Sequence, residues 1–188
     1  MKNAFVYLTI IFLAGCSANP SRIASTAKQE SSRLGVTSRP LSEFSNFELR
    51  PMELSAGVSD QKEKVVMAKQ LENKLSKKLL PLLEEWKADG SMSRTAGTLL
   101  IQPQLQSLRI ISGGNRFLAG SWAGDSLIDL NLKLADGQTG AIIANPRISR
   151  TSSAMGGAWS MGKTDKQLMD YIVGISHQYL VDNYKKQE

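Results

Sequence analysis

Residues 157–164 read Gly-Ala-Trp-Ser-Met-Gly-Lys-Thr and match the phosphate-binding loop pattern GxxxxGK[ST] letter for letter. In such a loop Lys163 would contact phosphate and Thr164 would bind magnesium. The loop requires a buried parallel strand that runs directly into it, whereas the best strand nearby ends near residue 149 and belongs to a predicted antiparallel hairpin. The sequence therefore predicts no nucleotide site, with Thr164 as a helix cap and Lys163 as its solvated neighbour.

The other groups capable of chemistry form no recognisable catalytic set. His177 is the only histidine and is expected on a partly buried helix face, and no second His or Cys in the folded domain can complete a metal site. Ser121 and Ser126 lie outside a nucleophile-elbow pattern. Asp125 and Asp129 could act as the paired carboxylates of a glycosidase, because folding can bring an acidic pair together. We expect no cofactor, no metal and no enzyme activity, with an envelope hydrolase acting on cell-wall or lipid substrates as the alternative.

Cys16 carries the clearest chemistry. Lys2 precedes an apolar run over residues 4–13, the layout of a secretory signal peptide over residues 1–15. As a helix, residues 4–15 would span about 18 Å, too short for a hydrocarbon core of about 30 Å. Residues 13–16, Leu-Ala-Gly-Cys, look like the lipobox of bacterial lipoproteins. That resemblance implies diacylation of the Cys16 sulfur, cleavage before Cys16 and acylation, for example by palmitate, of the new amine.

The segment that follows Cys16 predicts where the domain lies. Ser17 in place of Asp resembles the outer-membrane sorting signal of enteric lipoproteins, which implies a lipid anchor in the outer membrane facing the periplasm. Residues 16–40 are rich in Ser, Thr, Lys and Arg and predict a flexible tether of about 25 to 30 Å before a single domain over residues 41–188. Its basic residues could hold it near anionic headgroups, or it could be a simply solvated linker; they are Arg22, Lys28, Arg33 and Arg39, against Glu30.

Composition and charge narrow the class of partner. The chain has 188 residues, of which 41% are hydrophobic and 21% charged, enough for one domain with a real core. Lys2 is the only charged side chain in residues 1–15, so the chain without this segment keeps 23 − 1 = 22 basic and 17 acidic residues. This excess favours anionic partners such as lipid headgroups or acidic polymers. No recognition motif accompanies it, so nucleic acid is not a predicted partner.

Periodicity predicts the elements that position these residues. Strands are expected over residues 41–49 and 98–111, and an antiparallel hairpin over residues 126–149. In the second strand, Pro103 and a shift in phase of the buried positions between Leu105 and Leu108 predict a bulge or an edge. A long amphipathic helix is expected over residues 60–90, with Asp60 and Glu63 as a capping box and a kink or break at Pro81, and a last helix begins at Thr164. The order β-α-β-β-β-α predicts an α+β fold, a mainly antiparallel sheet with two helices on one face. The expected buried helix positions are Val65, Ala68, Leu71, Leu75, Leu79, Leu82, Trp86, Leu168, Tyr171, Ile172, Ile175 and Tyr179.

Residues 116–127, 136–140, 156–157 and 179–180 together resemble a family of uncharacterised bacterial envelope lipoproteins, domain-of-unknown-function family 4410. The resemblance covers residues 42–184, and Trp122 departs from it, because small residues or Phe are more usual there. It implies an envelope location and no known activity. The element order also resembles that of lipoproteins that assist envelope assembly, which is a likeness of fold alone.

The predicted topology places two segments at one end of the sheet. The strands that end near residues 111 and 149 should run the same way, so that residues 113–125 and 151–162 leave the same end. These segments contain Trp122 and Trp159, aromatic residues of the kind enriched at interfaces, and Arg116. The two rings could equally cap the core. We expect a lipid-anchored, non-catalytic binding or assembly module, with Arg116, Trp122 and Trp159 as its partner or membrane contacts.

Overall fold

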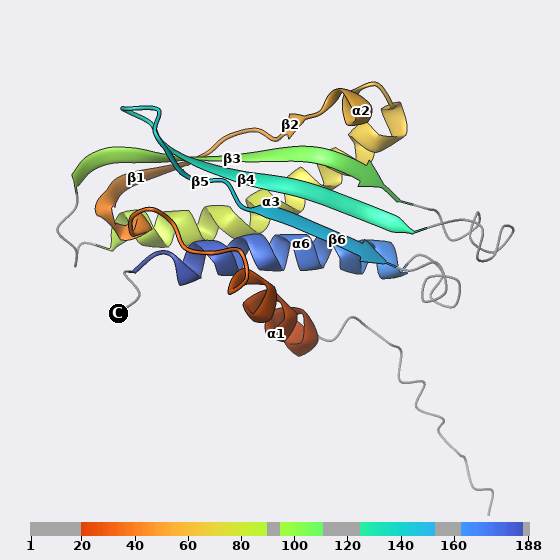
Figure 1. Ribbon diagram of the computed structural model, residues 1–188, viewed down its shortest axis with the longest axis horizontal. Coiled ribbons are helices and arrows are strands. Elements are labelled where there is room, and N and C mark those ends of the chain that lie inside the picture. The colour runs from red at the N-terminus through yellow and green to blue at the C-terminus, as the bar shows by residue number, and fades with distance from the viewer. Residues whose placement is uncertain (1–19, 90–94, 111–124, 153–162, 186–188) are drawn as a thin grey trace, which may run out of the picture.

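The described residues form a six-stranded sheet and four α-helices (Figure 1). The computed structural model describes residues 20–89, 95–110, 125–152 and 163–185. In chain order the elements are α1 (Pro20–Ser31), the 3-10 helix η1 (Leu41–Glu43), β1 (Phe44–Leu49), β2 (Glu53–Leu54), α2 (Ala56–Ser59), α3 (Lys62–Ala88), β3 (Thr95–Arg109), β4 (Ser126–Asp136), β5 (Ile142–Ala144), β6 (Arg147–Ser152) and α6 (Lys163–Asp182).

The sheet is mixed and mostly antiparallel, which confirms the predicted α+β class. Long strands β3 and β4 pair antiparallel at its centre, and β5 and β6 both pair antiparallel with β4, so the predicted hairpin is also confirmed. On the other side, β1 and β2 run parallel to β3. The parallel pair requires a crossover connection, which α3 supplies.

Strand β3 shows how the sheet accommodates a proline. The predicted bulge is confirmed, because pairing with β4 shifts register between Leu105 and Ser107. However, Pro103 is not at an edge. The Ile101 carbonyl accepts a hydrogen bond from the Arg50 N–H, and the Leu105 carbonyl accepts one from the Ser55 N–H. Pro103 lies between these two residues, at the point where the partner of β3 changes from β1 to β2. The missing N–H of Pro103 therefore removes no ladder bond.

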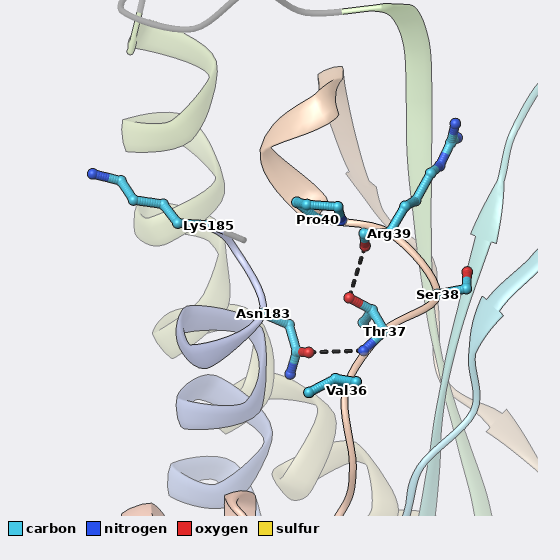
Figure 2. A pocket seen from close by; sticks show the side chains of 7 residues that line it. All are labelled: Val36, Thr37, Ser38, Arg39, Pro40, Asn183 and Lys185. Carbon is cyan, nitrogen blue, oxygen red and sulfur yellow. Dashed lines mark hydrogen bonds between the residues drawn. The ribbon is translucent and has the colours of Figure 1, made fainter. Parts of the chain in front are cut away.

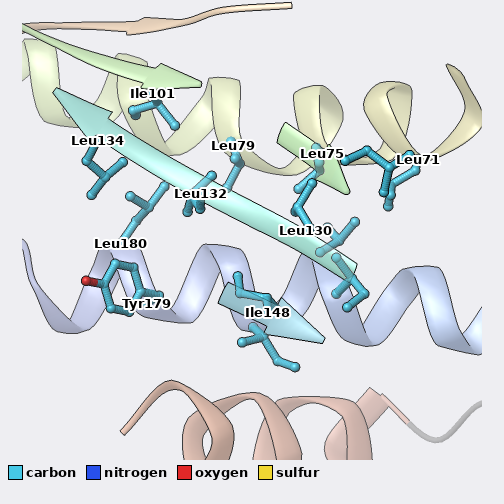
Figure 3. Packing of buried hydrophobic residues seen from close by; sticks show 14 of the residues in the cluster. Leu71, Leu75, Leu79, Ile101, Leu130, Leu132, Leu134, Ile148, Tyr179 and Leu180 are labelled. Carbon is cyan, nitrogen blue, oxygen red and sulfur yellow. The ribbon is translucent and has the colours of Figure 1, made fainter. Parts of the chain in front are cut away.

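Helices α3 and α6 cover one face of the sheet, as predicted, and Figure 3 shows their leucines meeting the inward residues of β4. On β4 this face presents Ile128, Leu130, Leu132 and Leu134, all fully buried. Burying such a side chain contributes about 1.5–3 kcal/mol, so this layer dominates the stability. The buried positions of α3 are Ala68, Leu71, Leu75, Leu79, Leu83 and Trp86.

Several details of the predicted helices differ from the structure. Helix α3 passes through Pro81 without a break, and it begins after Gln61, with no side-chain cap from Asp60. Asp60 instead ends the short helix α2, where its N–H donates a hydrogen bond to the Ala56 carbonyl. Leu83, not Leu82, continues the buried stripe, and Val65 is exposed. Tyr171 of α6 is only partly buried, and α6 begins at Lys163, one residue before the predicted cap.

The predicted flexible tether is wrong for residues 20–40. Helix α1 packs along α6, and its contact face consists of Ile23, Ala27 and Ser31, four residues apart. Gly174 of α6 has no side chain, so α1 approaches closely; a Cβ there would lie 3.3 Å from Ile23 and 3.5 Å from Ala27. Ile23 is the only large apolar residue of this contact face and the other two are small, which is why composition alone indicated a tether.

Candidate partner-binding surfaces

The predicted site residues Arg116, Trp122 and Trp159 lie outside the described residues. The strands that lead to them do have the predicted arrangement. Arg109 at the end of β3 pairs with Leu127, and Ser152 at the end of β6 pairs with Ser126, so both strands end beside the start of β4. The topology behind the predicted surface is therefore confirmed, whereas the surface itself stays a prediction.

The phosphate-loop pattern lies in a different context from a phosphate loop. Strand β6 pairs antiparallel with β4 and forms one edge of the described sheet. It ends at Ser152, ten residues before the start of α6 at Lys163. A phosphate loop instead joins a buried parallel strand directly to its helix. This topology supports the prediction that no nucleotide binds there.

The acidic pair considered for a hydrolase does not have the arrangement of paired catalytic carboxylates. Asp129 is buried and its carboxylate accepts two hydrogen bonds from Arg147, from Nε at 2.9 Å and from Nη2 at 2.6 Å. Asp125 immediately precedes β4, four residues before Asp129, which along an extended strand is about 13 Å. Paired carboxylates of glycosidases are about 5 to 9.5 Å apart. Asp129 therefore has a structural partner and Asp125 is too distant from it.

His177 lies half-buried on α6. Burial lowers the pKa of its imidazole, and the nearby positive charge of Lys78 on α3 lowers it further. Because both effects disfavour the protonated ring, His177 is a neutral side chain at the α3–α6 contact near neutral pH.

We expect this depressed pKa to make the protein less stable as the pH is lowered. The unfolded chain binds a proton near pH 6.5, whereas the folded protein resists it, so protonation favours unfolding. The contribution of neutral His177 is fully present above pH 6.5 and is lost as pH falls toward the folded pKa. Proton NMR of the single imidazole should show a midpoint below 6.5. Urea unfolding of His177→Gln should show less loss of stability over this range; equal losses would contradict the linkage.

An aromatic cluster lies at the C-terminal ends of α3 and α6. Trp86 and Tyr184 stack with ring centroids 4.1 Å apart and an interplanar angle of 15°. Phe47 of β1 meets the Trp86 ring edge-on, at 5.3 Å between centroids. Three separate elements thus converge on one aromatic cluster, although they are far apart in the sequence.

A hollow of about 420 Å³ lies over this cluster and we call it the aromatic groove. Its walls are the last turns of α3 and α6, and Val181 is 39% exposed within it. Charges of both signs surround the apolar centre, among them Glu85 and Lys185. The residues that line it are Leu82, Glu85, Trp86, Val181, Asp182, Tyr184 and Lys185. The helical periodicity predicts Trp86 as a core residue but cannot reveal the groove, because the second wall of the groove lies about 100 residues further along the chain.

A second hollow, of about 210 Å³, lies beside residues 36–40 and is shown in Figure 2. Its polar groups satisfy one another: the Thr37 N–H donates to Asn183 Oδ1 at 2.8 Å, and the Thr37 hydroxyl donates to the Arg39 carbonyl at 2.7 Å. The Arg39 side chain extends away from the hollow, forms an ion pair with Asp136 and covers the Phe44 ring. This region fastens residues 36–40 to the domain.

Asp136 also organises the turn after β4. Its carboxylate accepts hydrogen bonds from the N–H groups of Gln138 and Thr139, which are the first cause of its lowered pKa, and the ion pair with Arg39 lowers it further. Gly140 closes the turn with φ of +72°, a conformation that favours glycine. These interactions are structural.

Within the part of the chain that the structure describes, no three His, Cys, Asp or Glu side chains gather as a possible metal site. Within the same residues, no helix combines the length and apolar character that crossing a membrane requires.

Comparison with known proteins gives distant structural likenesses. No family model and no curated protein matches the sequence. A PelC dodecamer from Paraburkholderia phytofirmans is 12% identical, with 77% of this chain and 94% of that chain covered and a TM-score of 0.42. A variant of that dodecamer is also 12% identical, with 75% and 90% covered and a TM-score of 0.41. A candidate lipoprotein from Caulobacter crescentus CB15 is 15% identical, with 87% and 94% covered and a TM-score of 0.30.

Proposed function

We propose that this chain is a lipid-anchored lipoprotein of the bacterial cell envelope that works as a non-catalytic binding or assembly module. The anchor is Cys16, on the strength of the Leu-Ala-Gly-Cys sequence after a short apolar run. The outer membrane, facing the periplasm, is the proposed location, because Ser17 follows Cys16. Membership of domain-of-unknown-function family 4410 is part of this proposal and rests on the sequence resemblance.

The aromatic groove is the observation that carries the binding role. Stacked Trp86 and Tyr184 give it a rigid floor, and partly exposed Val181 supplies apolar surface that a partner can cover. Protein interfaces combine an apolar, aromatic centre with a polar rim, and Trp and Tyr are enriched where binding energy concentrates. Glu85 and Asp182 on the rim disfavour an acidic polymer. The groove therefore fits an envelope protein, which is the partner we propose.

Arg116, Trp122 and Trp159 remain a second proposed contact. The segments that contain them leave the sheet beside Arg109 and Ser152, near the start of α6. The aromatic groove lies at the other end of α6, a 20-residue helix about 30 Å long. The end of the sheet from which these segments leave is thus well separated from the aromatic groove.

A pair of matched valine substitutions tests the groove. Val181→Asp places a charge in it, and Val66→Asp makes the same change on α3, where Val66 is 58% exposed and outside the groove. Purification of the cross-linked lipoprotein from envelope membranes should recover a stoichiometric protein partner with the parent chain. We expect Val181→Asp to weaken recovery by tenfold or more, because a desolvated unpaired charge is costly in an interface, and Val66→Asp to preserve it.

Two results would contradict this proposal. Equal recovery of the partner by both valine variants would show that the groove is not the contact. Turnover of muropeptides or glycans by the purified domain would instead favour the alternative, an envelope hydrolase.

A further inference from the structure

Helix α1 is part of the folded domain and is also its first described element after Cys16. Close packing on Gly174 fixes its middle, and the Ser31 hydroxyl donates a 2.6 Å hydrogen bond to Asp182. Ile23 and Ala27 of α1 lie at Gly174 of α6, and Ser31, later in α1, bonds to Asp182, later in α6. The two helices therefore run parallel. Whatever holds the start of α1 therefore also orients the domain.

The chain between Cys16 and Pro20 is very short. Only residues 17–19 separate them, and four residue steps reach about 14 Å even when fully extended. If Cys16 carries lipid, the start of α1 must lie within this distance of the bilayer surface. A domain on a disordered tether would instead lie about 25 to 30 Å away and rotate freely.

The exposed face of α1 is basic. Arg22 and Lys28 are both exposed, and neither forms an ion pair within the described residues. The acidic residue of this helix, Glu30, is paired with Arg33 at 3.4 Å. Each such residue strengthens binding to an anionic lipid surface by roughly fivefold.

We propose that α1 docks the domain on anionic lipid headgroups through Arg22 and Lys28, which gives the lipoprotein a fixed orientation on its membrane. This inference rests on the proposed lipidation of Cys16. Figure 1 shows α1 below α6 in that view. Because α1 packs on α6, and α6 covers the inner face of the sheet, the outer face of the sheet is turned away from α1 and from the bilayer on which α1 docks.

Site-specific fluorescence on the lipidated protein tests this orientation. The thiol of the only native cysteine, Cys16, is blocked by acylation, so a cysteine introduced elsewhere is labelled alone. We choose Val181→Cys on α6 and Lys133→Cys on β4, whose neighbours Leu132 and Leu134 face the helices. In vesicles that contain phosphatidylglycerol and a nitroxide-headgroup lipid, quenching should be at least about twofold stronger at residue 181. Residue 181 is next to Asp182, which contacts α1, whereas residue 133 lies on the sheet face turned away from the helices.

Two kinds of variant separate docking from simple tethering. Gly174→Leu should displace α1 and make quenching at residues 181 and 133 equal, whereas Gly57→Leu should leave it unchanged, because a side chain at Gly57 meets open space. Arg22→Glu with Lys28→Glu should reduce the docked fraction, by roughly 30-fold or more in the docked-to-free ratio. Lys62→Glu with Lys77→Glu, on exposed positions of α3, is the charge-matched control.

The outcomes distinguish the two proposals. Protein that floats with vesicles but shows equal quenching at residues 181 and 133 would overturn docking and leave the anchor intact. Unequal quenching that survives both the α1 charge reversal and replacement of phosphatidylglycerol by phosphatidylcholine would overturn the role of Arg22 and Lys28. Protein that neither floats nor incorporates acyl label would overturn both the anchor and the docking.

Discussion

Cys16→Ser is expected to abolish attachment of the lipid anchor. Serine has no thiol for the diacylglyceryl transfer, so the lipid is not added and the lipoprotein signal peptidase has no substrate. Each buried CH₂ of an acyl chain contributes about 0.8 kcal/mol, so two or three chains hold a protein almost permanently, and their loss removes that entire contribution. Palmitate labelling should disappear, and the chain should accumulate as a precursor that is not cleaved before residue 16.

The matched control for this experiment is Ser17→Ala, which changes the next residue and leaves Leu-Ala-Gly-Cys intact. It should be labelled, processed and floated like the parent chain. The anchoring argument fails if Cys16→Ser is still cleaved before residue 16 and still fractionates with lipid. A variant that accumulates as an uncleaved precursor could remain in the inner membrane through residues 1–15, so the acyl label is the decisive measurement.

The sheet and the helices that cover it were predictable because the apolar residues of each element recur at a single regular spacing. Alternation of apolar and polar residues in β4 placed Ile128, Leu130, Leu132 and Leu134 on the inner face, as found. The stripe from Ala68 to Leu79 likewise identified α3 and its buried side. Parallel pairing of β1 with β3 was not predictable from pattern, since it depends on where the α3 crossover returns the chain.

Helix α1 could not be recognised because its contact face contains a single large apolar residue, Ile23. Ala27 and Ser31, which complete the contact, add no apolar stripe to the sequence, and the deciding residue, Gly174, lies about 150 residues away. Within α1 the pattern resembles a solvated linker rich in Ser and Lys. The consequence is functional, because a folded α1 brings the domain closer to the lipid than a tether would.

The aromatic groove was not predictable for a related reason. Trp86 ends the buried stripe of α3, and Tyr184 lies beyond the predicted stripe of α6, so each is an ordinary aromatic residue in its own segment. Their stacking follows from the parallel alignment of α3 and α6, along which Lys74 also reaches Asp170. A binding surface built between two helices is a property of their alignment and not of either sequence pattern.

Trp86→Ala is expected to be the most destabilising single substitution among the groove residues. The Trp86 side chain is 5% exposed, stacks on Tyr184 and meets Phe47 edge-on. Its removal therefore loses buried apolar area and two ring contacts, and it leaves a cavity. Truncation of a buried Trp to Ala costs about 3–5 kcal/mol in free energy of unfolding. For a domain of this size the unfolding temperature should fall by roughly 6–20 °C.

Urea unfolding followed by circular dichroism measures this cost, with Leu80→Ala as the control. Leu80 lies on the same helix and is 46% exposed, so its truncation should change the free energy of unfolding by only about 0.5 kcal/mol. Losses of similar size in the two variants would mean that the aromatic cluster does not fasten α3 to α6. A large loss confined to Trp86→Ala would show that the groove has a rigid floor, which is the property that lets it present Val181 to a partner without first paying to become ordered.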